Sequence, residues 1–275
     1  MTDIFNGVGD SRRPEFTSAF LPRRQGRKGT VNASLTDAIS AALARPEHQE
    51  HVVAGRVVLS EDGRPIRSII TGRRTQVTGS YASRKAGRGQ VFESMVERCF
   101  FMHCEVDIRV VDYRAQPFRF EFSLGGKWRT YIADCVRLMD NGRVEVVELK
   151  SDFRDLRNAD YQAKLDRVRR LCRLLGWRFS VIRRRHLEKS ALLQRNIELV
   201  QQDRLTAFND LHTYRVTEVL VDGPACFGDV AEALDARPVG DAIVRAMMVA
   251  RILEIDLRRP LNDDSPVRLL QRGRA

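Results

Sequence analysis

Two apolar runs flank Asn141-Gly142 in the segment Tyr131 to Lys150, YIADCVRLMDNGRVEVVELK. An Asn-Gly pair between runs rich in Val, Ile, Leu and Tyr is a strong signal for a two-residue turn, so the segment predicts a β-hairpin. Side chains two positions apart share one face of a strand. We therefore expect Glu148 and Lys150 on one face of the second strand and Leu149 on the other.

The charged residues of this hairpin suit the hydrolysis of a phosphodiester. If Asp134 presents its carboxylate on the Glu148 face, the two acids can hold a hard divalent cation between them. Mg²⁺ bound in this way activates water near neutral pH and compensates the negative charge that builds on the phosphate. Lys150 could orient or deprotonate that water, or stabilise the phosphate charge. The alternative interpretation is a hairpin whose alternate residues are merely solvated.

Two upstream segments favour the nuclease interpretation. Residues Val91 to Cys104 carry apolar side chains at three- and four-residue spacing, which predicts an amphipathic helix. Glu93 and Glu97 would lie on one face of it, where like charges repel mildly unless one of them is held near a cation. Gln116-Pro117 is expected to open a strand after an extended approach.

Four short segments carry a family resemblance: FESMVE at Phe92 to Glu97, YRAQPF at Tyr113 to Phe118, YIAD at Tyr131 to Asp134, and ELK at Glu148 to Lys150. On these segments the chain resembles the PD-(D/E)XK nuclease superfamily, and specifically the TnsA-type endonuclease subunit of heteromeric cut-and-paste transposases. The similarity covers roughly residues 80–182. It implies an α/β fold with a restriction-endonuclease-like mixed sheet flanked by helices, followed by a C-terminal winged helix-turn-helix domain.

The resemblance also implies the catalytic roles. The family's metal-binding aspartate falls on Asp134, its second ligand on Glu148 and its lysine on Lys150. One departure concerns the neighbours of the aspartate, because the family usually has proline before it and a bulky apolar residue after it. This chain has Ala133 and Cys135 there, which questions the geometry of the strand end more than the catalysis.

The family's N-terminal helix supplies a further glutamate. By its distance from Gln116 this residue falls on Glu97, with Glu93 the less favoured choice. Glu97 would bind the metal directly or through a water, and the carbonyl of Leu149 would supply an extra oxygen. Glu93 and Gln116 are accessory candidates.

For function, the resemblance implies a Mg²⁺-dependent DNA endonuclease, with Mn²⁺ able to substitute, that nicks the non-transferred strand at transposon ends. A DDE-type recombinase would make the complementary cut, and a AAA+ ATPase would regulate both. The runner-up is a standalone restriction- or repair-type nuclease with the same site. A non-catalytic DNA-binding adaptor comes third, because buried charges are costly to keep without a metal.

The net positive charge of the chain suits binding to a polyanion. The chain has 47 basic and 36 acidic residues, a net charge of +11, and a pI near 9.9, which is the electrostatic footprint of a nucleic-acid-binding protein. Its five cysteines include no C-x-x-C pair, so neither a disulfide framework nor a zinc site is indicated. No apolar run approaches membrane-spanning length. We expect a protein of the bacterial cytoplasm without membrane contact.

Three regions are expected along the chain. Residues 1–30 combine Gly, Pro and clustered Arg and predict a flexible basic arm, which either contacts phosphates or only aids solubility. Residues 31–185 would form the endonuclease domain, ending in a long helix from Phe153 to Leu175 and a strand through Ile182. Residues 186–275 would form the winged-helix domain, whose second helix runs from Pro238 through Ile252.

Basic residues in the last two regions are candidates for contact with DNA phosphates. These candidates are Arg84, Lys85, Arg88, Arg167, Arg170 and Arg245. Solvated surface positions are the alternative. The winged-helix region is also rich in Asp and Glu, so docking to a partner protein is as well supported there as DNA contact.

Overall fold

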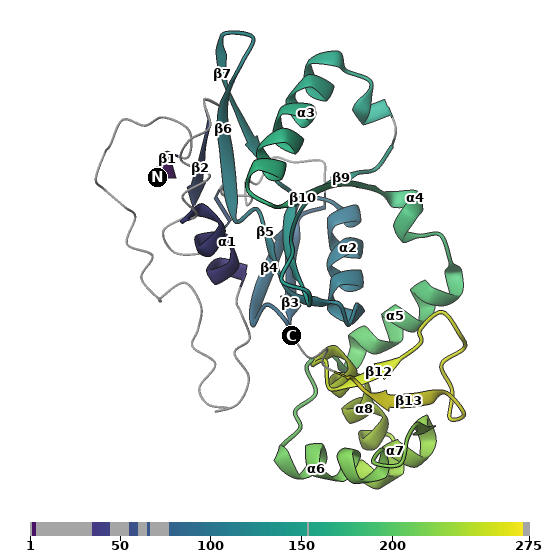
Figure 1. Ribbon diagram of the computed structural model, residues 1–275. Helices are drawn as coiled ribbons and strands as arrows, with labels where there is room; N and C mark the ends of the chain where they lie inside the picture. Colours follow the sequence, from purple (N-terminus) through teal and green to yellow (C-terminus); the bar gives the residue numbers. More distant parts are fainter. Residues whose placement is uncertain are drawn as a thin grey trace. The chain divides into compact units, whose positions relative to one another are not determined.

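A computed structural model describes residues 2–3, 35–44, 55–59, 65–66, 77–152 and 154–271 (Figure 1). The chain divides into two compact units, each made of three stretches of sequence. The first unit comprises Met1–Tyr81, Gly89–Arg98 and Arg109–His186, and the second comprises Ala82–Arg88, Cys99–Ile108 and Leu187–Ala275. The basic arm expected at residues 1–30 lies outside the described residues, apart from the two residues of β1 (Thr2–Asp3).

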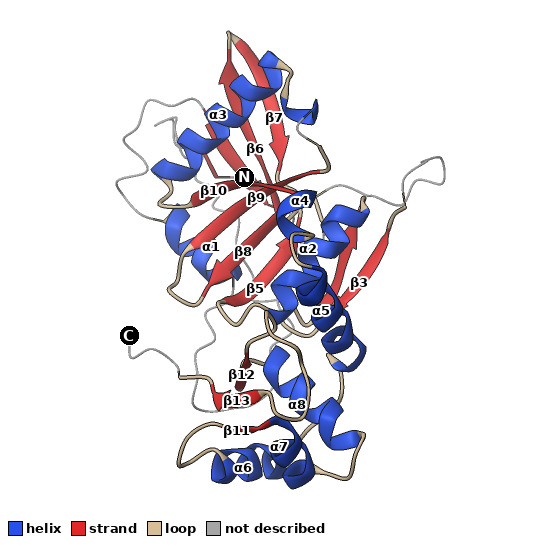
Figure 2. Cartoon of the chain, turned by 90° about the vertical axis from the view of Figure 1, so that its right-hand side faces the viewer, coloured by secondary structure: helices blue, strands red, loops and turns tan. Residues whose placement is uncertain are grey.

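A four-stranded mixed sheet forms the centre of the first unit. Its strands follow the order β10-β9-β8-β5 (Figure 2), with bounds β5 Val110–Ala115, β8 Cys135–Met139, β9 Val144–Lys150 and β10 Arg178–Arg183. Strand β10 runs parallel to β9, whereas β9 pairs antiparallel with β8 and β8 antiparallel with β5. The expected mixed sheet is therefore confirmed.

A second sheet in the same unit is antiparallel throughout. Its order is β1-β2-β6-β7, with β2 at Gly55–Leu59, β6 at Phe118–Leu124 and β7 at Lys127–Ile132. Strands β3 (Gly79–Ser83) and β4 (Arg88–Phe92) pair only with each other among the described residues. Sequence reasoning predicted one sheet for the nuclease fold, and the structure divides the strands between these sheets.

One apolar core joins both large sheets to helices α1 (Leu35–Leu43) and α3 (Ala159–Leu174). Helix α1 contacts β5, β8 and β9, and helix α3 contacts β6 and β10. In the core the ring of Phe118 lies 5.2 Å from that of Phe120 and 5.4 Å from that of Trp177, measured between centroids. Packing of this kind holds α3 beside β9 and β10, where the candidate site lies.

The predicted hairpin exists, with a longer loop than expected. Strands β8 and β9 pair in the register Leu138↔Val144, and the N–H of Met139 donates to the carbonyl of Arg143 over 2.9 Å. Three residues therefore lie between Met139 and Arg143, instead of the two that were expected. Gly142, the third of them, has φ +77°, a left-handed conformation that glycine adopts without strain.

Helix α2 (Met95–Val106) begins later than the sequence predicted. Val91 and Phe92 belong to strand β4, and Glu93 precedes the helix, so the prediction that Glu93 and Glu97 share a helical face is wrong. Ser94 caps the helix, because its hydroxyl accepts a hydrogen bond from the N–H of Glu97 over 3.2 Å. The Ser-x-x-Glu pattern of a capping box was legible in the sequence.

The predicted helix from Phe153 to Leu175 is divided. A 3₁₀ turn covers Arg154–Leu156, and α3 begins only at Ala159, where the side chain of Asn158 accepts the N–H of Tyr161 over 3.0 Å. The buried residues of α3 are Leu165, Val168, Leu171 and Cys172. Gly176 ends the helix with φ +70°, and β10 follows as expected.

The second unit is mainly helical, and its C-terminal part combines three helices with a small sheet. The first unit ends within α4 (Arg184–Leu187), and the second unit continues in chain order with α5 (Ala191–Asp203), α6 (Asp210–Val219), β11 (Ala225–Cys226), α7 (Phe227–Leu234), α8 (Val239–Val249), β12 (Leu253–Ile255) and β13 (Pro266–Leu269). The sheet is antiparallel in the order β11-β13-β12. Helices α7 and α8 pack closely, since a Cβ on Gly240 would lie 2.1 Å from the carbonyl oxygen of Ala231.

Helix α8 is shorter than the predicted span from Pro238 to Ile252. It ends at Val249, and Arg251 adopts φ +61°. The N–H of Ile252 then donates to the carbonyl of Met247 over 3.0 Å, a C-terminal motif that usually contains glycine. Because Arg251 and not glycine occupies the left-handed position, the sequence carries no glycine signal for this helix end.

Every helix among the described residues is too short or too polar to cross a bilayer.

Candidate active site

Asp134 lies one residue before β8, at the end of the β8–β9 ladder. Because Cys135 pairs with Val147 in the antiparallel register, Asp134 falls beside Glu148. The N–H of Leu149 donates a hydrogen bond to Oδ2 of Asp134 over 2.7 Å. The two acids predicted to converge across the hairpin therefore come from adjacent positions of neighbouring strands.

Glu148 is buried and its carboxylate is surrounded by donors. Its side chain is 4% exposed, and Oε1 lies 2.6 Å from Nζ of Lys150. The hydroxyls of Tyr131 and Tyr161 also donate to this carboxylate, one to each oxygen. The expectation that Glu148 and Lys150 share one face of β9 is confirmed by their contact.

Glu97 occupies the first turn of α2. Its carboxylate accepts the N–H of Glu93 over 2.8 Å and the hydroxyl of Ser94 over 2.9 Å. The neighbouring acid, Glu93, accepts a hydrogen bond from the side-chain amide of Gln116 over 3.0 Å. Both carboxylates are nearly buried, so the start of α2 presents two acids to the interior of the first unit.

Gln116 links this helix end to Asp134. Its side chain contacts Glu93, while its own N–H donates to the backbone carbonyl of Asp134 over 3.3 Å. It has φ +46°, which is strained for a residue other than glycine and is held here by the surrounding contacts. Gln116 thus lies between the α2 acids and the hairpin acids, as an accessory residue of the site would.

The charges of the neighbouring acids shift the pKa of Asp134. Burial raises the pKa of Asp134 well above its usual value, and the charges of Glu148 and Glu97 raise it further. Burial alone would lower the pKa of Lys150, but the carboxylate of Glu148 more than offsets this and leaves that pKa raised. The site therefore combines an excess of negative charge with one firmly protonated ammonium group.

The donor chemistry of this cluster fits a hard cation, because carboxylate oxygens are the ligands that Mg²⁺ prefers. Burial and the charges of Glu148 and Glu97 raise the pKa of Asp134 although Lys150 lowers it, and a bound cation would favour the carboxylate form. Among the described residues, however, no group of three or more His, Cys, Asp and Glu side chains is placed to hold a metal. Joint ligation by Glu97, Asp134 and Glu148 stays a prediction.

The family model for the TnsA-like endonuclease N-terminal domain matches residues 107–184. This segment is similar to the N-terminal domain of TnsA-like endonucleases. It contains Asp134, Glu148 and Lys150, and it excludes Glu97, which lies ahead of the matched residues. The resemblance seen in the sequence is thereby confirmed for fewer than a third of the chain's residues. A search of the curated proteins finds no match.

Two aromatic residues of the matched segment were missed by sequence reasoning. Tyr131 on β7 and Tyr161 on α3 both bind the carboxylate of Glu148. Burial and the charge of Glu148 raise the pKa of each phenol above its ordinary value, so both remain protonated donors. Only the tertiary packing brings Tyr161 to this position, and nothing in its sequence neighbourhood indicated it.

Two of the DNA-contact candidates are engaged inside the second unit. Lys85 is nearly buried, and its ammonium donates to the carbonyls of Cys104 and Asp107 over 2.9 and 2.6 Å. Arg84 donates from its guanidinium to the carbonyls of Arg204 and Thr206. In this conformation both side chains serve the packing of that unit, which disfavours the predicted DNA contacts.

The remaining candidates differ in exposure. Arg170 on α3 is exposed, Arg88 and Arg167 are half-buried, and Nε of Arg167 has no hydrogen-bond partner among the described residues. Arg245 on α8 is engaged, since its Nε lies 2.7 Å from Oδ2 of Asp203. Arg170 is therefore the candidate whose surroundings best suit contact with a phosphate.

Proposed function

We propose that this chain is the DNA endonuclease subunit of a heteromeric TnsA-like transposase, and that it nicks the non-transferred strand at transposon ends. The observation that carries the proposal is the convergence of Asp134, Glu148 and Lys150 on one edge of the sheet, inside a TnsA-like endonuclease domain. The charge of Glu97 acts on Asp134 as well, which brings the start of α2 into the same site.

In this proposal Asp134 and Glu148 hold a divalent cation, with Mg²⁺ the natural choice and Mn²⁺ a substitute. Glu97 would contribute directly or through a water, and the carbonyl of Leu149 would add an oxygen. When bound, the cation activates water and offsets the negative charge that develops on the phosphate. Binding would also lower the raised pKa of Asp134, since a positive charge favours the carboxylate form.

The chain's own residues account for the rest of the chemistry. Lys150 stays protonated beside Glu148, so it is suited to orient the water and to stabilise charge on the phosphate rather than to act as the base. Tyr131 and Tyr161 fix the orientation of the Glu148 carboxylate. Gln116 donates hydrogen bonds to the Glu93 carboxylate and to the backbone carbonyl of Asp134, and so links the two.

For the second unit we propose a winged helix-turn-helix that docks to partner proteins of the transposase. Its support is the order of α6, β11, α7, α8 and the β12–β13 hairpin, together with the sheet order β11-β13-β12. Helix α8 takes the place of a recognition helix, yet most of it is buried, and Arg245, the basic residue within it, is paired with Asp203. A helix with so little free charge is poorly suited to a DNA groove, which favours a DDE-type recombinase or a AAA+ ATPase as its partner.

Cleavage of transposon-end DNA by the reconstituted subunits, with Mg²⁺ or Mn²⁺, tests the proposal. Asp134→Ala and Lys150→Ala should each abolish the nick on the non-transferred strand while leaving the cut on the other strand. Glu198→Ala removes an exposed acid of α5 and serves as the matched control with full activity. Equal nicking by all of these proteins would refute the assigned site, and we expect the isolated subunit to cut weakly at most.

A further inference from the structure

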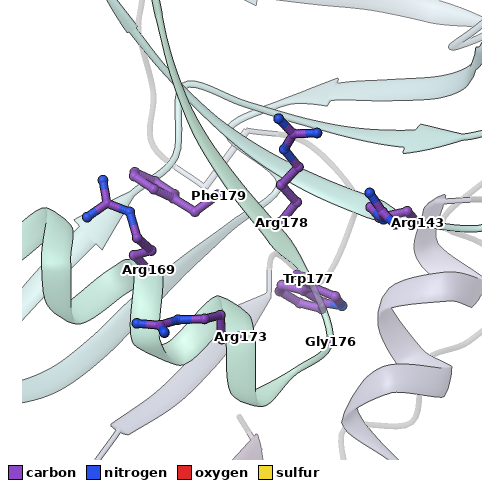
Figure 3. A pocket seen from close by; sticks show the side chains of 7 residues that line it. All are labelled: Arg143, Arg169, Arg173, Gly176, Trp177, Arg178 and Phe179. Atoms are coloured by element: carbon purple, nitrogen blue, oxygen red, sulfur yellow. The ribbon is translucent and has the colours of Figure 1, made fainter.

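A pocket of about 450 Å³ in the first unit is lined by four arginines (Figure 3). Arg143 comes from the loop before β9, Arg169 and Arg173 from α3, and Arg178 from the first position of β10. The aromatic side chains of Trp177 and Phe179 line the same pocket. Three separate elements of the chain therefore bring guanidinium groups to one concave surface.

The positive charge of this arginine pocket is only half balanced. Arg169 pairs with Asp166 of its own helix, and Arg178 lies 3.5 Å from Glu145. Arg143 and Arg173 form no ion pair with any described residue. Guanidinium groups that line one pocket without a counter-charge repel one another unless an anion lies between them.

A neutral donor in the same pocket also lacks an acceptor. Trp177 is 4% exposed, and its indole Nε1 has no hydrogen-bond partner among the described residues. A buried N–H without an acceptor costs free energy. An oxygen-rich anion in the arginine pocket would supply the counter-charge that Arg143 and Arg173 lack, next to the Trp177 side chain that lines the same pocket.

The arginine pocket is separate from the acid site. Arg143 precedes the first residue of β9, whereas Glu148 and Lys150 lie at the other end of that strand. At about 3.3 Å per residue, the two sites are on the order of 20 Å apart. One phosphate cannot reach both, so an anion held here differs from the phosphodiester that is cut.

We propose that the arginine pocket binds a backbone phosphate of the DNA substrate, at a distance from the scissile bond. This inference rests on the proposed nuclease function, because that function supplies the DNA. Guanidinium groups bind phosphate oxygens in a planar, two-pronged arrangement. Exposed Arg170 on the same helix continues the positive surface. The contact would position the duplex without reading its sequence.

Fluorescence of Trp177 reports directly on this pocket. The chain has two tryptophans, and the other, Trp128, is 61% exposed, so Trp128→Phe leaves Trp177 as the only tryptophan, which can be excited selectively over tyrosine. We would titrate the full-length Trp128→Phe protein with a mixed-sequence DNA duplex in EDTA, and follow Trp177 emission and duplex anisotropy together. A saturable change in Trp177 emission that tracks the anisotropy is expected.

Removal of the two unpaired charges should abolish that change. In the double variant Arg143→Gln/Arg173→Gln, affinity should fall by roughly tenfold near physiological salt, and the slope of log K against log salt should decrease by about two. Lys127→Gln/Lys189→Gln removes the same charge from exposed positions outside the pocket and should keep the Trp177 response. Arg143→Gln alone, in a loop, carries the test if the double variant unfolds.

The outcomes separate this inference from the proposed function. DNA binding without a Trp177 response, or equal salt slopes in the pocket and control variants, would overturn the phosphate site even if cleavage still depends on Asp134. A Trp177 response to the purified recombinase or ATPase, but none to DNA, would overturn it as well. Conversely, a DNA-dependent Trp177 response with nicking that survives Asp134→Ala would support the pocket and refute the proposed nuclease site.

Discussion

The N–H of Leu149 donates a hydrogen bond of 2.7 Å to the carboxylate of Asp134. This contact closes the end of the β8–β9 ladder and fixes Asp134 beside Glu148, the residue next to Leu149. Because the donor is the backbone N–H of Leu149, this contact orients the Asp134 carboxylate without a second polar side chain. The site is thus built into the hairpin that carries it.

Asp134→Asn should stabilise the protein at neutral pH in the absence of divalent cations. The folded-state pKa of Asp134 is raised, so its stabilising contribution is present below the unfolded-state pKa near 3.8 and is lost as pH rises through the folded-state pKa. Asparagine resembles the protonated acid at every pH. Urea unfolding of both proteins from acid to neutral pH should show a gap that widens with pH; a gap that is constant would contradict the raised pKa.

Two variants separate capping of α2 from catalysis. Ser94→Ala removes the cap and should cost about 1 kcal/mol of stability, with nicking retained at low temperature. Glu97→Gln keeps one acceptor oxygen for the N–H of Glu93, so it should cost less than about 1 kcal/mol but lose most of the nicking. Thermal unfolding and nicking rates of the two proteins test this. Full activity of Glu97→Gln would reduce Glu97 to a structural residue.

Tyr161→Phe should lower nicking by roughly tenfold to a hundredfold, the usual cost of removing a partner that orients a metal ligand. The hydroxyl of Tyr161 donates to Glu148, and phenylalanine keeps the ring while removing this donor. Tyr214→Phe, at an exposed position of α6, is the matched control. Faster nicking by Tyr161→Phe would mean that the tyrosine restrains Glu148 instead of orienting it.

Lys85→Met should act on stability and leave DNA affinity unchanged. Loss of the donor to the carbonyls of Cys104 and Asp107 should cost about 1–3 kcal/mol. Burial lowers the pKa of Lys85 from 10.5 to about 8. The free energy of unfolding of the wild type should therefore increase as pH rises from about 8 to 10.5, and this gain is lost as pH falls back through about 8. Urea unfolding should show that rise only in the wild type. A weaker DNA affinity of folded Lys85→Met would restore Lys85 as a DNA contact.

The hairpin and its acids were predictable because strand periodicity is local. A period of two fixes the shared face of Glu148 and Lys150, and the Asn-Gly signal locates the turn. Register then brings Asp134 opposite Glu148 without any information from the rest of the chain. These are the features that the structure and the family match support best.

Other parts of the site depend on contacts that the sequence does not encode locally. Tyr161 reaches Glu148 only because α3 packs across the sheet, and Gln116 reaches Glu93 over 23 positions of sequence. The start of α2 was legible in Ser94 and Glu97, but the apolar run from Val91 outweighed that signal. The arginine pocket joins a loop, a helix and a strand, so no single segment reveals it.

Anomalous diffraction from crystals grown with Mn²⁺ tests the central claim most directly. We predict one anomalous peak between the carboxylates of Asp134 and Glu148, about 2.1 Å from an oxygen of each, and its disappearance in Asp134→Asn crystals. The absence of such a peak in crystals that bind Mn²⁺ elsewhere, with Asp134 still bonded to Leu149 and Glu148 still bonded to its two tyrosines and Lys150, would contradict the claim.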